Sequence, residues 1–260
     1  MADRPRVLVT RRIPDAGLSA LPDVAEVDLW DDELPPAREV LLERVRGVDG
    51  LLSLLTDRVD GELLVAAGPS LKVVSNYAVG YDNIDVEACR ERGVAVGNTP
   101  GVLTETTADL AFALLMAVAR RLPESYDYVR QDRWQTWGPL LLLGVDIHGA
   151  TLGIVGFGRI GREMARRAKG FGMRTLYYDR VQAPAEVEAE LEATFTPLDD
   201  VLAEADFVSL HTALTEETHH LIDAAALARM KQGAILINSS RGPVVDPAAL
   251  AEALRSGHLF

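Results

Sequence analysis

The sequence predicts an α/β protein with two domains, each built on a parallel β-sheet covered by helices on both faces. Short apolar runs typical of buried strands alternate with helix-compatible segments along nearly all of its 260 residues. A Pro-Gly pair interrupts this alternation near Asn98–Gly101, and a second series of strands starts at Thr151. We therefore expect one domain at residues 1–98 and a second at residues 99–260.

Five segments of the first domain have the apolar content of buried strands. Helix-compatible stretches separate them, as the crossovers of a parallel sheet require. The segments are Arg6–Thr10, Val24–Trp30, Gly50–Thr56, Lys72–Ser75 and Val94–Val96.

The second domain opens with a long, mostly apolar helix expected over residues 104–130, with a break near Pro123. An arm follows around residues 131–143, and residues 182–192, which contain Pro and several Glu, are expected to form a surface segment. Strands are expected at Thr151–Val155, Met173–Tyr178, Phe207–Leu210 and Ala234–Asn238.

A glycine motif follows the first strand of the second domain. The segment Thr151–Gly161 runs from an apolar strand into the pattern Gly156-x-Gly158-x-x-Gly161, with a helix expected behind it. In a dinucleotide site the three glycines allow a tight turn, a close approach to the pyrophosphate and close packing of helix on strand. Asp179 ends the next strand, about 20 residues beyond the first glycine, where a carboxylate accepts from ribose hydroxyls. The motif predicts a nicotinamide dinucleotide site; an ordinary glycine-rich turn is the alternative.

The charge of the chain bears on whether it binds nucleic acid. The formal net charge of −13 argues against general nucleic-acid binding, which depends on neutralising phosphates. A basic cluster on the helix behind the glycines is expected to be its solvated face, except for the residue beside the phosphates, Arg159. The other members of the cluster are Arg162, Arg166, Arg167 and Lys169.

The cysteine count and the lengths of the apolar runs indicate the cellular compartment and whether the chain crosses a membrane. Cys89 is the single cysteine, which excludes a disulfide framework and fits a reducing cytoplasm. No signal pattern begins the chain, and its apolar runs are too short to span a bilayer. We expect a cytoplasmic protein without a membrane or nucleic-acid partner, and no metal site.

Six motifs in order along the chain resemble those of the D-isomer-specific 2-hydroxyacid dehydrogenases, most closely the glyoxylate/hydroxypyruvate reductase group. The resemblance implies a flavodoxin-like substrate domain, a Rossmann dinucleotide-binding domain and a homodimer. It also implies NAD(P)H-dependent reduction of glyoxylate or hydroxypyruvate to the D-2-hydroxy acid. The motifs are Ser75–Asp85, Asn98–Gly101, Thr106–Leu110, Gly153–Gly161, Ser209–Thr215 and Ile237–Gly242.

The resemblance also implies a set of substrate-binding residues. Arg241 matches the catalytic arginine, whose rigid donor fork can pair with a carboxylate and stays charged at any working pH. Val79 and Gly80 match the backbone positions that receive the substrate carboxylate. Leu55 follows a strand and either walls the pocket or belongs to the core.

An aromatic pair in the arm, Trp134 and Trp137, is similar to one that reaches the partner subunit's site in related reductases. Trp137 is therefore a candidate substrate-site residue of the partner subunit. Dimer packing alone is the alternative.

The cofactor positions carried over from the family surround the glycine motif. NAD is expected, because the Asp179 carboxylate would repel the 2′-phosphate of NADP. Arg180 leaves NADP possible, since it could bind that phosphate, or it could stack on adenine. The positions are Gly156, Phe157, Gly158, Arg159, Ile160, Gly161, Asp179, Arg180, Thr212, Ser239 and Ser240.

The largest departure from the family lies at the end of the chain. The family's catalytic set is Arg, Glu and His, and the sequence stops at Phe260, before the Glu and the His. His258 matches a variable turn, His219 and His220 are expected to begin a helix, and His211 has a structural role near the cofactor. We expect a C-terminally truncated Rossmann domain, without its last strand and C-terminal helix.

Two functions follow from this departure. A general acid contributes about 10²–10⁴-fold to catalysis, so an enzyme lacking the Glu–His pair should turn over very weakly. The alternative is a non-catalytic dinucleotide-binding remnant, or an NAD-sensing protein on the same fold.

Overall fold

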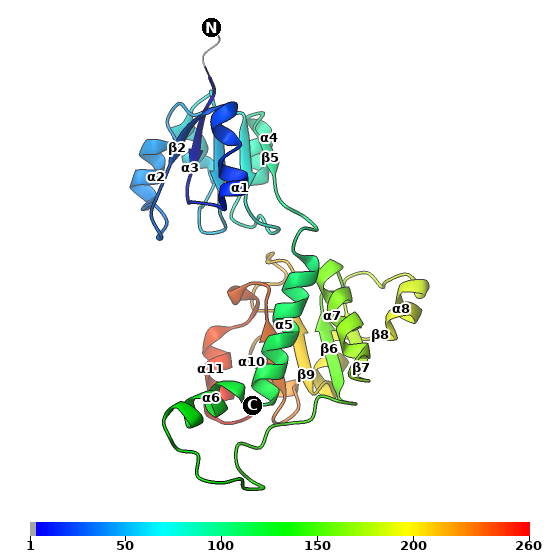
Figure 1. Ribbon diagram of the computed structural model, residues 1–260. Coiled ribbons are helices and arrows are strands. Elements are labelled where there is room, and N and C mark those ends of the chain that lie inside the picture. Colours follow the sequence, from blue (N-terminus) through cyan, green and yellow to red (C-terminus); the bar gives the residue numbers. More distant parts are fainter. Residues whose placement is uncertain (1–3) are drawn as a thin grey trace. The chain divides into compact units, whose positions relative to one another are not determined.

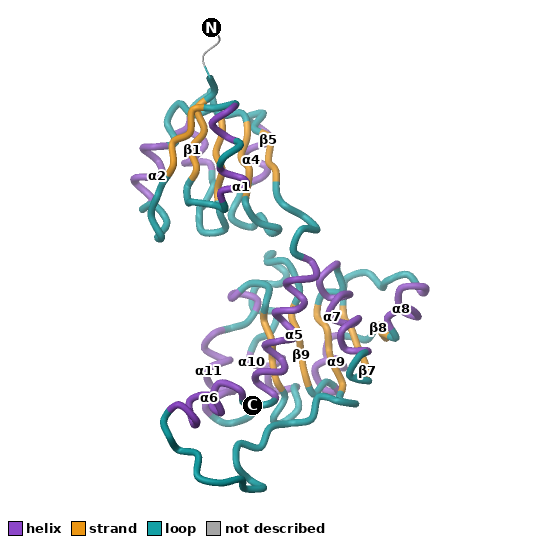
Figure 2. The backbone as a smooth tube through the Cα atoms, in the orientation of Figure 1, coloured by secondary structure: helices purple, strands orange, loops and turns teal. Residues whose placement is uncertain are grey.

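The computed structural model describes residues 4–260, and the chain divides into two compact units, Met1–Val102 and Leu103–Phe260. Both units have a five-stranded sheet whose paired strands all run parallel (Figure 1). Helices connect the strands of each sheet, as Figure 2 shows by colour. The predicted fold class is confirmed.

The sheet of the first unit has the strand order β2-β1-β3-β4-β5, which is the flavodoxin-like order. Its strands are β1 (Arg6–Val9), β2 (Glu26–Leu29), β3 (Gly50–Ser53), β4 (Val73–Asn76) and β5 (Ala95–Gly97). Its helices are α1 (Asp15–Leu18), α2 (Arg38–Arg44), α3 (Gly61–Ala67) and α4 (Val86–Glu91), with a 3-10 turn at Leu21–Asp23.

The second unit has the order β10-β9-β6-β7-β8, in which the connection reverses direction between β6 and β9. Its strands are β6 (Thr151–Val155), β7 (Arg174–Tyr178), β8 (Ala193–Phe195), β9 (Phe207–Leu210) and β10 (Ile235–Asn238). Its helices are α5 (Thr104–Ala119), α6 (Leu122–Arg130), α7 (Arg159–Lys169), α8 (Ala185–Leu191), α9 (Leu198–Glu204), α10 (Ala224–Arg229) and α11 (Pro247–Arg255), with a 3-10 turn at Gly242–Val244.

This order is that of the Rossmann fold, and it determines where a ligand can bind. In open α/β sheets the crevice lies outside the carboxyl ends of the strands at the switch point, here β6 and β9. The residues that follow Val155 and Leu210 therefore lie beside this crevice. They include the glycine motif.

Two hydrophobic layers hold the second sheet. Helices α5 and α7 pack side by side on one face, where Leu115 and Met164 are fully buried beside Ile154 (Figure 1). Helices α9, α10 and α11 cover the other face, with Leu202 and Leu227 in the core. The apolar strands thus bury both faces, as the sequence predicted.

Two expectations about the second unit are confirmed and can be made more specific. The helix expected over residues 104–130 is broken near Pro123, because Arg121 adopts a left-handed conformation (φ 50°) between α5 and α6. Most of the segment 182–192 lies at the surface, and it also forms α8, whose Leu191 is 1% exposed and packs into the core. The short strand β8 that follows was not predicted.

Candidate active site

The three glycines after β6 have different surroundings. Gly156 has φ +93°, and a Cβ there would lie 2.7 Å from the carbonyl carbon of His211. A Cβ on Gly161 would lie 2.2 Å from the Gly156 carbonyl oxygen. A Cβ on Gly158 would meet nothing within 4 Å, and Gly158 has φ −72°. The first and third glycines are required by the fold itself, whereas the second borders open space.

The carboxylate of Asp179 is bound to this loop. Its Oδ2 accepts a hydrogen bond from the backbone N–H of Phe157 at 2.7 Å, and its Oδ1 accepts one from the Arg180 N–H at 2.7 Å. The ring of Phe157 stacks on that of Tyr177, with centroids 3.8 Å apart. Asp179 is thereby fixed beside the glycine motif, where a ribose is expected to bind.

The basic residues of α7 lie on an accessible face, with Arg166 and Lys169 exposed, and they also form ion pairs. Arg167 donates from Nε to Asp109 of α5 at 2.7 Å and from Nη1 to its neighbour Glu163. Arg166 pairs with Glu190 of α8 at 2.7 Å. These residues connect α7 to the helices on either side, whereas Arg159 is exposed at the first turn of α7.

The residues after β9 and β10 lie at the same edge of the sheet as the glycine motif, because the strands are parallel. The hydroxyl of Thr212 is buried and has no hydrogen-bond partner within residues 4–260. Ser239 and Ser240 are half-buried, and Ser240 donates to Oδ1 of Asn238 at 2.8 Å. An orphaned buried hydroxyl is a group that a bound ligand can satisfy.

His211 lies between two serine hydroxyls at this edge. Its Nε2 is 2.9 Å from Oγ of Ser209, and its Nδ1 is 3.5 Å from Oγ of Ser239. Burial lowers the pKa of His211 from 6.5 to about 4. The imidazole is therefore neutral at physiological pH, which fits a structural role and not that of a proton donor.

Arg241 follows β10 at the carboxyl end of the sheet. Its carbonyl oxygen accepts from Nδ2 of Asn238 at 2.8 Å, and a 3-10 turn begins at the next residue, Gly242. The side chain is half-buried. The guanidinium is thus carried by a loop whose backbone is anchored to the strand.

In the first unit, Val79 and Gly80 lie in the loop after β4, and both are half-buried. Leu55 follows β3 and is 46% exposed, so the alternative that it belongs to the core is wrong. It lines a cavity of about 450 Å³ together with Val59 and Asn83. Leu55 can therefore wall a pocket of this unit.

The arm after α6 contains no helix or strand and extends as a long loop (Figure 1). Its two tryptophans are largely accessible, with Trp134 52% and Trp137 73% exposed. Leu140 is 81% exposed. Much of this apolar surface is therefore accessible in the unit that carries it.

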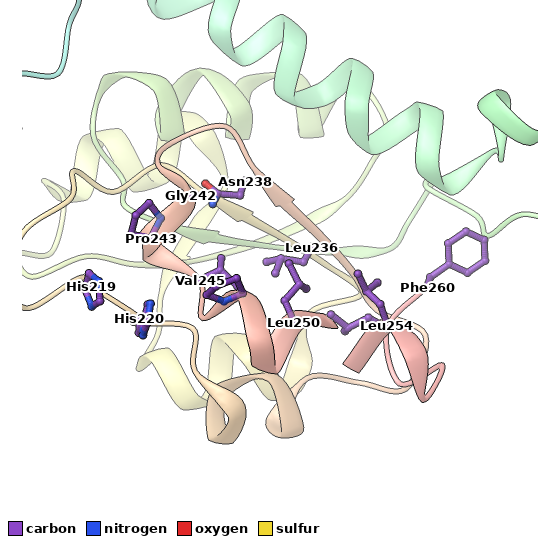
Figure 3. Close-up of a pocket in the computed structure, with 12 residues that line it drawn as sticks. His219, His220, Leu236, Asn238, Gly242, Pro243, Val245, Leu250, Leu254 and Phe260 are labelled. Carbon is purple, nitrogen blue, oxygen red and sulfur yellow. The ribbon is translucent and has the colours of Figure 1, made fainter. Parts of the chain in front are cut away.

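The remaining histidines lie away from the glycine motif. His219 and His220 stack with centroids 4.0 Å apart in a turn, so the expectation that they begin a helix is wrong. They line a cavity of about 570 Å³ beside β10 and α11, together with Leu236 and Leu250 (Figure 3). No residue of the glycine motif lines this cavity, so we do not place a dinucleotide there. Nε2 of His258 is 3.0 Å from the carbonyl oxygen of Leu227 in α10.

Sequence reasoning missed a buried polar network behind the loop of the first unit. Ser53 and Asn76 are fully buried, and the Ser53 hydroxyl donates to Oδ1 of Asn76 at 3.1 Å. Asn83 donates from Nδ2 to the carbonyl oxygens of Leu54 and Asp57. The detectable signal was a polar residue ending an apolar strand, because such a residue needs a buried partner.

Neither a metal cluster nor a membrane-spanning helix occurs among residues 4–260. No group of three or more His, Cys, Asp or Glu side chains there could hold a metal ion. No helix in the same range combines the length and apolarity that crossing a membrane requires.

The second unit fits a dinucleotide in two respects. Open space beside Gly158 admits a pyrophosphate close to the backbone, at the start of α7 where the helix dipole favours negative charge. The orphaned Thr212 hydroxyl offers a hydrogen bond at the adjacent strand end. Gly158 and Thr212, two of the predicted cofactor residues, form these features.

Comparisons with known proteins agree with this geometry. Residues 112–260 match the D-isomer specific 2-hydroxyacid dehydrogenase, NAD binding domain. A glyoxylate reductase from Korarchaeum cryptofilum is 57% identical over 255 residues, which is 98% of this chain and 76% of that protein. A crystal structure of a Thermus thermophilus protein has a TM-score of 0.90 at 50% identity and covers 98% of this chain and 79% of that one.

A crystal structure of a glyoxylate reductase from Paecilomyes thermophila has a TM-score of 0.85 at 34% identity, covering the whole of this chain and 80% of that one. The resemblance drawn from the sequence motifs is therefore confirmed, as is the expectation of an NAD-binding domain. The chain belongs to the D-isomer specific 2-hydroxyacid dehydrogenase family, and residues 112–260 are its NAD-binding domain.

Proposed function

We propose that this protein reduces a small 2-oxo acid, glyoxylate or hydroxypyruvate, to the D-2-hydroxy acid with NADH. One observation carries the proposal: the glycine motif, Thr212 and Arg241 all follow carboxyl ends of one parallel sheet. A site for a dinucleotide and a fixed positive charge for a carboxylate or a polarised carbonyl therefore share one edge. Family relatives named glyoxylate reductase support the choice of substrate.

Each residue has a separate role in this proposal. The guanidinium of Arg241 pairs with the substrate and polarises its carbonyl, because it remains charged and offers a planar donor fork. The backbone N–H groups of Val79 and Gly80 bind the carboxylate, and Leu55 supplies an apolar wall. The bound dinucleotide supplies the hydride.

The cofactor residues divide between phosphate and ribose. Gly156, Gly158 and Gly161, with Phe157, Arg159 and Ile160, form the turn and helix start for the pyrophosphate, and Thr212, Ser239 and Ser240 contribute from the neighbouring strand ends. Asp179 accepts from the ribose and favours NAD over NADP. Arg180, which is exposed next to it, would allow a 2′-phosphate to bind with lower affinity.

Binding tests this proposal more directly than turnover does. His211 is neutral, with a pKa of about 4, so we do not assign it the role of proton donor. A positioned general acid contributes about 10²–10⁴-fold to turnover, whereas binding of the dinucleotide and of the acid does not depend on one.

The proposal also covers the roles of the two domains, the oligomeric state and the compartment. We assign substrate binding to residues 1–98 and dinucleotide binding to residues 99–260. A homodimer forms through the exposed arm, in which Trp137 reaches the partner's substrate site. Cys89 is buried, and burial raises the pKa of its thiol, which fits a reduced cysteine in the cytoplasm.

The experiment is a titration of NADH fluorescence with glyoxylate and hydroxypyruvate. We expect saturable NADH binding and a second, saturable change on adding either acid, and Arg241→Gln should abolish only the second. Arg174→Gln is the matched control, because Arg174 is exposed at the amino end of β7, where it pairs with Glu204. NADH binding that is indifferent to both acids would instead identify a dinucleotide-binding protein without a substrate site.

A further inference from the structure

Three consecutive carbonyl groups in the loop after β4 are each held by a hydrogen bond. The Ala78 oxygen accepts from the backbone N–H of Thr99 at 2.9 Å. The Val79 oxygen accepts from Nδ2 of Asn98 at 2.8 Å, and the Gly80 oxygen accepts from Nδ2 of Asn76 at 2.9 Å. All of these groups belong to the first unit.

Fixing a carbonyl also fixes the N–H group of the next residue. A trans peptide is planar, so its C=O and N–H point in opposite directions. By holding the Val79 carbonyl, Asn98 therefore sets the direction of the Gly80 N–H. In the same way Thr99 sets the direction of the Val79 N–H through the Ala78 carbonyl. Asn76 sets the direction of the Tyr81 N–H through the Gly80 carbonyl.

These N–H groups belong to residues that reach the surface and have no acceptor in the described fold. Asn76 is fully buried, whereas Val79 and Gly80 are half-buried and Tyr81 is 54% exposed. The N–H groups of Val79, Gly80 and Tyr81 donate to no acceptor within residues 4–260. Successive backbone N–H groups that have no acceptor in the fold can together bind an anion.

The side chain of Asn76 is itself oriented. Its Oδ1 accepts from the Ser53 hydroxyl at 3.1 Å, which leaves its NH₂ group to face the loop. Asn98 lies just beyond β5, which pairs with β4 in parallel, so the two asparagines reach the loop from neighbouring strand ends. Asn76 is thus the last residue of β4 and Asn98 the first residue after β5, so both side-chain anchors lie outside the loop that they hold.

We propose that Asn98 and Asn76 are positioning residues that pre-organise the loop for a substrate carboxylate, Asn98 through the Gly80 N–H and Asn76 through the Tyr81 N–H. This inference rests on the proposed function, because it requires the loop to bind a carboxylate. Neither asparagine touches the substrate. Without the anchors, the peptide planes must be ordered at each binding event, which weakens binding.

The test uses oxamate, an unreactive carboxylate analogue of a 2-oxo acid, and the full chain saturated with NADH. Amide resonances of ¹⁵N-labelled Val79, Gly80 and Tyr81 are followed by NMR during the titration. In the wild type we expect saturable shifts at these amides. In Asn98→Ala we expect about tenfold weaker oxamate binding and a selective loss of the Gly80 response, while the Val79 amide, held by the Thr99 backbone, still responds.

The control variant is Asp85→Ala, which removes the N-cap of α4, where Asp85 accepts from the Ala88 N–H at 2.9 Å. It lowers the stability of the same unit without touching the three carbonyls, so its oxamate affinity should equal that of the wild type. Asn98→Ser repeats the comparison if Asn98→Ala does not fold. NADH affinity should be unchanged in all of these variants.

The outcomes separate the two proposals. If the wild type binds oxamate and Asn98→Ala binds it equally well with the same Gly80 shift, the positioning role is wrong and the carboxylate site stands. If the wild type binds NADH but its Gly80 and Val79 amides never respond to oxamate, the carboxylate site itself is wrong, and the positioning role falls with it.

Discussion

At the scale of single residues, the glycine motif combines two physical requirements. Gly156 and Gly161 leave no room for a side chain, because a Cβ on either would lie under 3 Å from backbone atoms. Gly158 faces open space and has an ordinary negative φ. The absence of a side chain at Gly156 and Gly161 is needed for folding, whereas at Gly158 it leaves room for a ligand to approach the backbone.

This difference predicts opposite results for two alanine substitutions. Gly158→Ala should leave the melting temperature unchanged or raise it slightly, since an unstrained Gly→Ala change stabilises by about 0.4–1 kcal/mol, yet it should weaken NADH binding at least about tenfold. Gly161→Ala should lower the melting temperature sharply or prevent folding. Thermal unfolding with and without NADH distinguishes them; a stable Gly161→Ala variant would contradict the packing argument.

His211 predicts a pH dependence of stability. Its pKa is lowered to about 4 in the folded protein, against 6.5 for an unburied histidine, so the unfolded state binds the proton more tightly. The stabilisation is fully present above pH 6.5 and is lost as the pH falls from about 6.5 to about 4, with a magnitude of about 3 kcal/mol.

Urea unfolding at about pH 7 and about pH 4.5, on either side of most of this transition, measures the effect. The wild type should lose more stability between the two pH values than His211→Gln, which lacks the titrating group. Equal losses in both proteins would mean that His211 is not buried as a neutral ring.

At the scale of elements, β6 packs so closely against α9 that position 153 has no room for a side chain. A Cβ on Gly153 would lie 2.7 Å from Cγ1 of Val201 and 2.9 Å from Cβ of Ala205. Gly153→Ala should therefore destabilise the second unit by about 1–3 kcal/mol through overpacking. Gly97→Ala in β5 is the matched strand control, because its Cβ meets nothing within 4 Å. Chemical unfolding of both variants tests the contact, and equal stabilities would contradict it.

Most strands were predictable because they are short apolar runs, and those at the centre of each sheet, such as β6 and β9, are buried on both faces. Thr151–Val155 and Phe207–Leu210 are strands with the bounds that the sequence indicated, and the other predicted strands differ only at their ends. The break after α5 was predictable from Pro123, but its form was not, because Arg121 adopts a left-handed conformation that its residue type does not favour. Three-residue β8 is ordered by pairing with β7 and carries no strong pattern of its own.

At the scale of the whole molecule, the apolar arm predicts self-association. Trp137, Leu140 and Leu143 are 73%, 81% and 56% exposed in a chain whose net charge is −13. Contiguous exposed apolar groups on a protein surface mark an interface.

Sedimentation analysis should show a homodimer for the wild type and a monomer for the double variant Trp137→Ser, Leu140→Ser. Leu34→Ser, which changes a leucine 72% exposed in the first unit, should remain a dimer. A monomeric wild type would refute the dimer, and a dimeric double variant would exclude the arm as its interface.

The sequence by itself determined the fold class, the glycine motif and the family, because strand burial and loop glycines impose local patterns that can be read along the chain. It also indicated Asp179 and Thr212 as cofactor positions, through spacing and resemblance. Only the tertiary structure decided how groups distant in sequence meet. Asn98 donates to the Val79 carbonyl, and the Asp179 carboxylate accepts from the Phe157 N–H. The tertiary structure also showed that the Thr212 hydroxyl has no partner among residues 4–260. The physical reason is that a hydrogen bond depends on the distance and direction between two atoms, and these are set by strand order and register rather than by the neighbours of either residue.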